Sequence, residues 1–249
     1  MNKELEPDCT RAAPPITWHA ASLQQEIYFS TKRCLDVLGS LIALTLLAPI
    51  MALIALLIKM DTPGPAIFRQ ERIGARRVRR NSHNEWQQVR FHCYKFRSMV
   101  CYADPDLHRR YVQALIQNDQ NCMEELQGGD NHIRKLVNDP RVTRIGRLLR
   151  KTSMDELPQF FNVLIGNMSL VGPRPAIPYE VEIYKPWHNQ RLNAIPGITG
   201  LWQVTARSSA DFDEMVWLDI LYIENQSFWL DLKILLKTPF VVLTARGAH

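Results

Sequence analysis

The stretch Val37–Ile58 (VLGSLIALTLLAPIMALIALLI) carries no charged residue from end to end, and nothing else in the chain is comparably apolar. Asp36 and Lys59 bound it. A straight helix rises about 1.5 Å per residue, so this stretch would just cover the hydrocarbon core of a bilayer, which is about 30 Å thick. The stretch therefore predicts a membrane-associated helix, and this prediction decides the fold class.

Two features of the apolar stretch argue against a plain transmembrane span. Pro49 sits near its midpoint, where it removes a helix hydrogen bond and clashes with the preceding turn. Basic residues lie on both sides, in 32–33 and 59–80, so charge gives no bias toward one orientation. We expect a re-entrant helix over about 34–59 that is broken at Pro49, with a kinked span and a buried soluble helix as the alternatives.

Composition and charge narrow the class of protein further. The net charge of +5 favours anionic partners such as phosphate groups or anionic lipid, and the hydrophobic fraction of 46% supports a packed core. The five cysteines form no C-x-x-C pair, which indicates reduced thiols facing the cytoplasm. Residues 1–27 lack an apolar signal-peptide region, so we expect a poorly ordered polar tail followed by one domain over 28–249.

The remainder of the chain predicts a helix-rich, mixed α/β domain. Short strands are expected at 66–68, 86–96 and 201–205, with a basic loop over 70–80 and a tight turn at 196–200. Helices are expected at 142–151, 179–194 and 212–223, with a helical surface excursion over 101–137. Residues 228–243 combine aromatic and apolar residues with lysines, which suits an amphipathic interfacial helix, although core packing explains them equally well.

A pair of adjacent carboxylates, Asp155 and Glu156, lies between a basic and an apolar segment. A helix can begin here in two ways: Ser153 and Glu156 can form a capping box, or Asp155 can be the N-cap with Pro158 in the first turn. The second fits Pro158 better. Upstream basic residues recur at helical spacing and should keep both acids ionised. These residues are Arg144, Arg147, Arg150 and Lys151.

Three further cations stand where a ligand could meet them. Lys95 and Arg97 are expected at the end of a strand. Pro173 and Pro175 limit the backbone freedom of Arg174, and its planar guanidinium with five donors suits a phosphate or a uracil edge. An ordinary turn with an exposed arginine is the alternative interpretation.

Several short motifs follow one another along the chain. They are Lys32-Arg33-x-x-Asp36, the apolar helix with its proline, Gly64–Gln70, Lys95–Met99, Asp139–Thr143, Thr152–Gln159, Met168–Pro175 and Pro196–Gly200. With these motifs in this order, residues from about 32 to 245 closely resemble the bacterial sugar transferase family. These are the monotopic polyprenyl-phosphate phosphoglycosyl transferases that start exopolysaccharide, O-antigen or glycoprotein glycan synthesis.

The resemblance implies a reaction and the residues that perform it. A hexose-1-phosphate would move from a nucleotide diphosphate sugar, usually a UDP-sugar, to undecaprenyl phosphate with release of UMP. Asp155 would be the nucleophile, would carry the phosphosugar covalently and would hold Mg²⁺, while Glu156 would position the acceptor phosphate or the metal. The implied substrate-binding residues are Lys95, Arg97, Arg147, Arg150, Pro173, Arg174, Pro175, Gln203 and Arg207.

The resemblance also implies a location, which is the bacterial cytoplasmic (inner) membrane with the catalytic domain on its cytoplasmic face. A homo-oligomer is compatible with it. Two positions depart from the family: Ala48 stands where a serine often precedes Pro49, and Thr205-Ala206-Arg207 stands where relatives tend to have Asn-Gly-Arg. The rival interpretation is a membrane-anchored basic protein that binds anionic lipid or nucleic acid without turnover. No nucleic-acid-reading module is recognisable, so no nucleic acid partner is expected.

Overall fold

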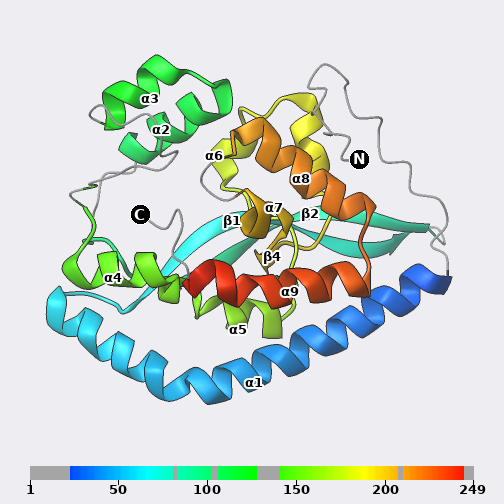
Figure 1. Cartoon of the computed structure of the whole chain (residues 1–249), viewed down its shortest axis with the longest axis horizontal. Coiled ribbons are helices and arrows are strands. Elements are labelled where there is room, and N and C mark those ends of the chain that lie inside the picture. Colours follow the sequence, from blue (N-terminus) through cyan, green and yellow to red (C-terminus); the bar gives the residue numbers. More distant parts are fainter. Residues whose placement is uncertain are drawn as a thin grey trace.

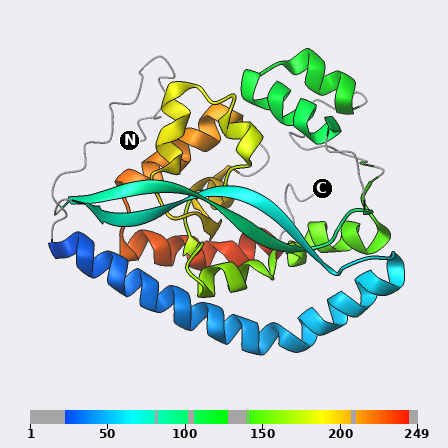
Figure 2. The same ribbon diagram turned by 180° about the vertical axis from the view of Figure 1, so that it is seen from behind.

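The computed structural model describes residues 23–80, 83–101, 106–127, 139, 141–206 and 210–243. Its first element is α1 (Leu23–Asp61), and the other elements lie on one side of this helix (Figures 1 and 2). In chain order these are β1 (Ile67–Arg80), β2 (His83–Phe96), α2 (Asp106–Gln117), α3 (Gln120–Gln127), α4 (Arg144–Thr152), η1 (Met154–Glu156), α5 (Gln159–Leu164), β3 (Ser169–Val171), α6 (Pro178–Val181), η2 (Pro186–Leu192), β4 (Gly197–Thr199), α7 (Leu201–Thr205), α8 (Phe212–Glu224) and α9 (Phe228–Leu243). The predicted helix-rich, mixed α/β architecture with a long apolar N-terminal helix is confirmed.

Helix α1 continues through Pro49 instead of breaking there. It begins at Leu23, well before the predicted start near residue 34. Figure 1 shows that α1 is bent, with both ends turned toward the rest of the protein. A proline inside a helix removes one hydrogen bond and crowds the preceding turn, so it can bend a helix without ending it.

The apolar middle of α1 is largely exposed. Its most apolar 18-residue window has a mean hydropathy of 2.9, and only 11% of that window is buried. No other helix in the described part of the chain is long and apolar enough to cross a membrane. A core helix of a soluble protein would be mostly buried, so exposure of this kind favours membrane association over the soluble alternative. The exposed residues include Leu38, Leu41, Ile42, Leu46, Ile50, Leu53 and Leu56.

The N-terminal part of α1 is tied to the domain by the basic–acidic motif seen in the sequence. The Arg33 guanidinium donates to two carbonyl groups at the C-terminal end of α5, at 2.6 and 2.9 Å. Buried Asp36 accepts the backbone N–H of Leu170 in β3 at 2.9 Å, and Lys32 pairs with Asp231 of α9 at 2.7 Å. Three elements therefore hold one end of the apolar helix against the domain.

Strands β1 and β2 form one long antiparallel hairpin of 14 residues per strand. The register pairs Ile67 with Phe96 at one end and Arg80 with His83 at the other. The predicted basic loop over 70–80 is therefore wrong, because these residues all belong to β1. Its arginines are compatible with a strand because Arg76 and Arg79 are exposed to solvent.

The second sheet contains the two short parallel strands β3 and β4. Residues 196–200, predicted as a turn, contain β4, and the strand predicted at 201–205 is helix α7. Close approach makes this pairing possible: a Cβ on Gly197 would lie 2.1 Å from the backbone nitrogen of Gly172. The helix predicted over 179–194 is divided into α6 and η2.

Helices α2, α3, α4 and α9 agree with their predicted positions more closely than the elements of the second sheet do. In the described part of 101–137, α2 and α3 form the expected helical excursion, and α2 packs on α8 through Val112 and Ile116. Helix α4 begins after Thr143, whose Oγ1 accepts the N–H of Gly146 at 2.9 Å. Helix α9 is continuous, and apolar residues such as Trp229, Leu236 and Phe240 are exposed on it together with its lysines.

Candidate active site

The acidic pair lies in a tight connection between α4 and α5. Ser153 ends α4 in the left-handed conformation, with φ +56°, and its backbone N–H bonds to the carbonyl of Arg150. Asp155 and Glu156 then occupy the 3₁₀ turn η1, and Pro158 directly precedes α5. Both predicted capping arrangements are therefore wrong, because the acids belong to a turn of their own between the two helices.

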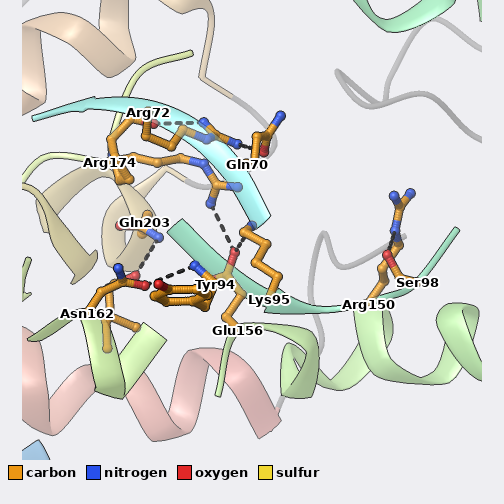
Figure 3. Close-up of polar contacts among 12 residues, drawn as sticks. Gln70, Arg72, Tyr94, Lys95, Ser98, Arg150, Glu156, Asn162, Arg174 and Gln203 are labelled. Carbon is orange, nitrogen blue, oxygen red and sulfur yellow. Dashed lines mark hydrogen bonds and ion pairs between the residues drawn. The ribbon is translucent and has the colours of Figure 1, made fainter. Parts of the chain in front are cut away.

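The buried side chain of Asn162 holds this connection against the long hairpin. Its Nδ2 donates to the carbonyl of His92 at 2.7 Å, and its Oδ1 accepts the backbone N–H of Tyr94 at 2.9 Å (Figure 3). These two bonds fix α5 to β2, which also contacts η1. Lys95, the next residue along β2, is thereby brought to the acidic turn.

Glu156 is the centre of the resulting cluster. Lys95 Nζ lies 3.0 Å and Arg174 Nη1 3.4 Å from its Oε1, and Figure 3 shows both side chains pointing toward it. Burial alone would raise the pKa of Glu156, but the charges of Lys95 and Arg174 and the Lys95 hydrogen bond lower it to about 2. This carboxylate is therefore ionised at neutral pH, as expected.

Asp155 has a different environment from its neighbour. Burial and the negative charge of Glu156 raise the pKa of Asp155 above the ordinary value, while Lys95, Arg150 and Arg174 oppose the shift. A carboxylate with a raised pKa is more basic, and so a better nucleophile, than an ordinary one. The pair thus combines one firmly ionised acid with one activated acid.

The loop that presents Arg174 is held rigidly on both sides. The backbone N–H of Gly197 donates to the carbonyl of Pro173 at 2.8 Å. From the hairpin, the buried guanidinium of Arg72 donates to the carbonyl of Pro175 at 2.8 Å and to Gln70 Oε1 at 2.6 Å (Figure 3). Sequence reasoning missed Arg72, because it was assigned to a solvated basic loop over 70–80.

Arg147 and Arg150, the two arginines of α4 that were predicted to bind substrate, differ in their surroundings. Arg150 donates through Nε to Ser98 Oγ at 3.0 Å, apart from the Glu156 cluster in Figure 3, yet its charge still acts on Asp155. Arg147 is exposed on α4. The helix therefore supplies positive charge around the acidic turn rather than direct partners for it.

The predicted nucleotide-side residues are described only in part. Gln203 lies on α7, and its Nε2 donates to the carbonyl of Ile198 at 3.2 Å. Its Oε1 is buried and has no hydrogen-bond partner among the described residues. Arg207 lies outside the described residues.

Arg97 does not join the cluster, although it was predicted to bind substrate. Its guanidinium is buried and donates to the carbonyls of Pro63 and Thr62, each at 2.6 Å, and to that of Ile58 at 3.2 Å. A Cβ on Gly64 would lie 2.3 Å from Arg97 Nη1, so this glycine makes room for it. Arg97 therefore caps the C-terminal end of α1, where cations complement the free carbonyls of a helix.

Replacing Arg97 with alanine should reduce stability rather than substrate affinity. The variant leaves three carbonyl groups without a charged donor, which we expect to cost about 2–4 kcal/mol of folding free energy. Thermal unfolding in detergent should show a lower Tm, with the KM for the nucleotide sugar unchanged at temperatures where the variant is folded. A large rise in that KM at unchanged Tm would return Arg97 to the binding site.

The residues at the site fit a magnesium ion only together with a substrate. The described residues contain no group of three or more His, Cys, Asp or Glu side chains that could hold a metal. The nearby cations already engage Glu156, which leaves Asp155 as the available carboxylate. Magnesium commonly binds through one or two carboxylates, waters and substrate phosphates, so a single carboxylate is compatible with it.

Comparison with known proteins agrees with the site. Residues 27–245 match the family described as Bacterial sugar transferase. The chain is 41% identical over 218 residues to the undecaprenyl-phosphate galactose phosphotransferase of Salmonella typhimurium, covering 88% of this chain and 41% of the relative. It is 38% identical over 218 residues to the exopolysaccharide production protein ExoY of Rhizobium meliloti, covering 88% of each.

A third relative has a name that states its reaction. It is the UDP-glucose:undecaprenyl-phosphate glucose-1-phosphate transferase of Caulobacter vibrioides, 38% identical over 227 residues, or 88% of this chain and 72% of the relative. The chain spans less than half the length of several curated relatives that it matches. The match nevertheless covers nearly all of this chain and includes the acidic turn and its cations. The chain belongs to the bacterial sugar transferase family.

Proposed function

We propose that this protein transfers a hexose-1-phosphate from a UDP-sugar to undecaprenyl phosphate and releases UMP, as the first membrane step of exopolysaccharide or other glycan synthesis. The observation that carries the proposal is the acidic turn, in which Asp155 is adjacent to Glu156 and Glu156 contacts the cations Lys95 and Arg174. The names of three relatives, from Salmonella, Erwinia and Caulobacter, describe transfer of a sugar or sugar phosphate to undecaprenyl phosphate or a lipid carrier.

The proposed chemistry has two displacement steps at one phosphorus. A carboxylate oxygen of Asp155 attacks the β-phosphorus of the UDP-sugar, and the bond from this phosphorus to the bridging oxygen breaks, so that UMP leaves. A phosphate oxygen of the lipid then attacks the same phosphorus. The bond to Asp155 breaks, which restores the carboxylate and yields the lipid diphosphate sugar. An acyl phosphate is reactive enough for this second displacement.

Cations around the turn would stabilise the charge of the transferring group. Lys95 and Arg174 contact Glu156, and the positive charge of Arg150 acts on Asp155. The rigid 172–175 loop holds Arg174 in its position. Phosphoryl transfer depends mostly on positioning and electrostatic stabilisation, which is what such a cluster provides. When bound at Asp155, Mg²⁺ would neutralise charge on the diphosphate oxygens.

The membrane helix would place this site at the level of the lipid headgroups. The apolar middle of α1 is exposed, while both of its ends face the domain (Figure 2). A helix that enters one leaflet and returns would keep both ends on the cytoplasmic face of the inner membrane. Basic residues near both ends support that arrangement, because cytoplasmic flanks are enriched in lysine and arginine.

Release of UMP is the test of the proposed function. Purified protein in detergent would be incubated with undecaprenyl phosphate, Mg²⁺ and a panel of UDP-sugars. We expect UMP to form over many turnovers with one or a few of these sugars, and such repeated turnover should require the lipid phosphate. Absence of UMP with every sugar, together with salt-sensitive binding to anionic vesicles, would instead support a binding protein without turnover.

A further inference from the structure

An open hollow lies where the chain leaves α1 and enters β1. It has a volume of about 600 Å³ and is lined by Lys59, Pro65, Ala66, Ile67, Phe68 and Arg69. The apolar side chains in it are unusually accessible: Phe68 is 50% and Ile67 37% exposed.

The hollow is next to the catalytic cluster. Phe68 lies directly opposite Lys95 in the antiparallel register of β1 and β2. Residues paired in this way point to the same face of the hairpin, with Cβ atoms about 5 Å apart. Since Lys95 Nζ is 3.0 Å from Glu156, the aromatic ring stands beside the residue that joins the hairpin to the acidic turn.

The hollow also matches an anion that carries an apolar chain. Its lining combines apolar residues with two cations, Lys59 and Arg69. Within the described residues neither of these cations forms an ion pair, and Arg69 lies 5.7 Å over the ring of Tyr94. Lys59 directly follows the apolar stretch of α1, so the hollow opens where a lipid chain lying along α1 would meet the headgroup region.

We propose that this hollow is the docking site for the first isoprene units of the polyprenyl phosphate acceptor, with Phe68 as the main contact. The lipid chain would lie along the exposed face of α1 and cross Phe68. Its phosphate would then lie toward Lys95, which points to the same face of the hairpin as Phe68. The inference rests on the proposed function and specifies where its second substrate binds.

The test compares two phenylalanine truncations. Phe68→Ala removes the proposed contact. Phe240→Ala removes a ring of α9 that is more accessible than Phe68, at 72% exposure, and lies outside the hollow. Steady-state kinetics would be measured with undecaprenyl phosphate and with a two-isoprene phosphate. We expect Phe68→Ala to raise the KM for undecaprenyl phosphate about tenfold, with kcat and the KM for the UDP-sugar nearly unchanged. Phe240→Ala should leave the acceptor KM unchanged.

Two results would overturn the docking site. Equal rises in acceptor KM in both variants would show that Phe68 only anchors the protein to the lipid phase. An unchanged acceptor KM in Phe68→Ala would show that the acceptor does not use the hollow. The lipid-independent half-reaction, exchange of labelled UMP into the UDP-sugar, separates these failures from failure of the proposed function. If the wild type shows neither exchange nor transfer, both proposals are wrong.

Discussion

Replacing Asp155 with asparagine is expected to lower UMP release by about a thousandfold or more. Asparagine has nearly the same size as aspartate, but its amide cannot form the acyl phosphate. Because Asp155 makes no ion pair within the described residues, its replacement should leave the fold intact. The measurement is UMP release with undecaprenyl phosphate and a UDP-sugar, run beside the wild type at equal protein concentration.

The control for this prediction is Asp106→Asn, which makes the same chemical change at an exposed acid at the start of α2. It should retain wild-type turnover. The exchange of labelled UMP into the UDP-sugar should also disappear in Asp155→Asn, because exchange needs the covalent intermediate. Robust turnover without exchange would contradict the two-step mechanism and favour direct attack by the lipid phosphate on the UDP-sugar.

Replacing Lys95 with methionine is expected to lower kcat about a hundredfold, the second largest effect. Methionine keeps the apolar stem but removes the ammonium that lies 3.0 Å from Glu156 Oε1. The site then loses a cation for the transferring phosphate, and Glu156 keeps only Arg174, at 3.4 Å. Steady-state kinetics would show the loss chiefly in kcat, since the charge matters most when the phosphorus is being transferred.

The same variant should change the pH profile in a defined direction. In the wild type, Lys95 is the first of the charges that lower the pKa of Glu156 to about 2 against the effect of burial, so this group stays ionised at any moderately acidic pH. Without Lys95, burial raises the pKa of Glu156 again. Lys95 also lowers the pKa of Asp155, whose carboxylate must be ionised to attack. Loss of Lys95 therefore raises the pKa of both acids, and the acidic limb of the kcat profile should move upward.

Two control variants make this result specific. Lys95→Arg keeps the charge and should keep the acidic limb near its wild-type position. Lys237→Met removes an exposed lysine from α9 and should alter neither kcat nor the profile. A wild-type profile in Lys95→Met would mean that Arg174 alone holds Glu156 ionised, and that Lys95 is dispensable for the reaction.

The sequence by itself determined the long apolar helix, α4 and the acidic pair. Each of these rests on information contained in one short segment. An uncharged run such as Val37–Ile58 has few possible environments, and a helix such as α4 reveals itself through the helical spacing of its arginines. The ordered motifs likewise led to the family that the comparisons then showed.

Only the tertiary structure decided which of the predicted cations meet the acids. Glu156 is reached by Lys95 across 61 positions of sequence and by Arg174 across 18, and such distances are set by packing between elements. Arg97, two residues from Lys95, caps α1 instead, because the chain bends after β2 and brings it to the end of that helix. Lys95 and Arg97 are both cations near the end of the same strand. Neither their residue type nor their spacing could therefore show which of the two contacts Glu156.

The long hairpin shows that secondary structure, too, can depend on a partner that the local sequence does not reveal. A strand is stabilised by a partner strand, and the arginines of 70–80 gave no apolar alternation from which to infer one. Once β2 pairs with it, Arg72 becomes a buried support for the 172–175 loop and Phe68 lies opposite Lys95. Local patterns report which face of a segment is apolar, whereas the identity of its neighbour is a property of the whole fold.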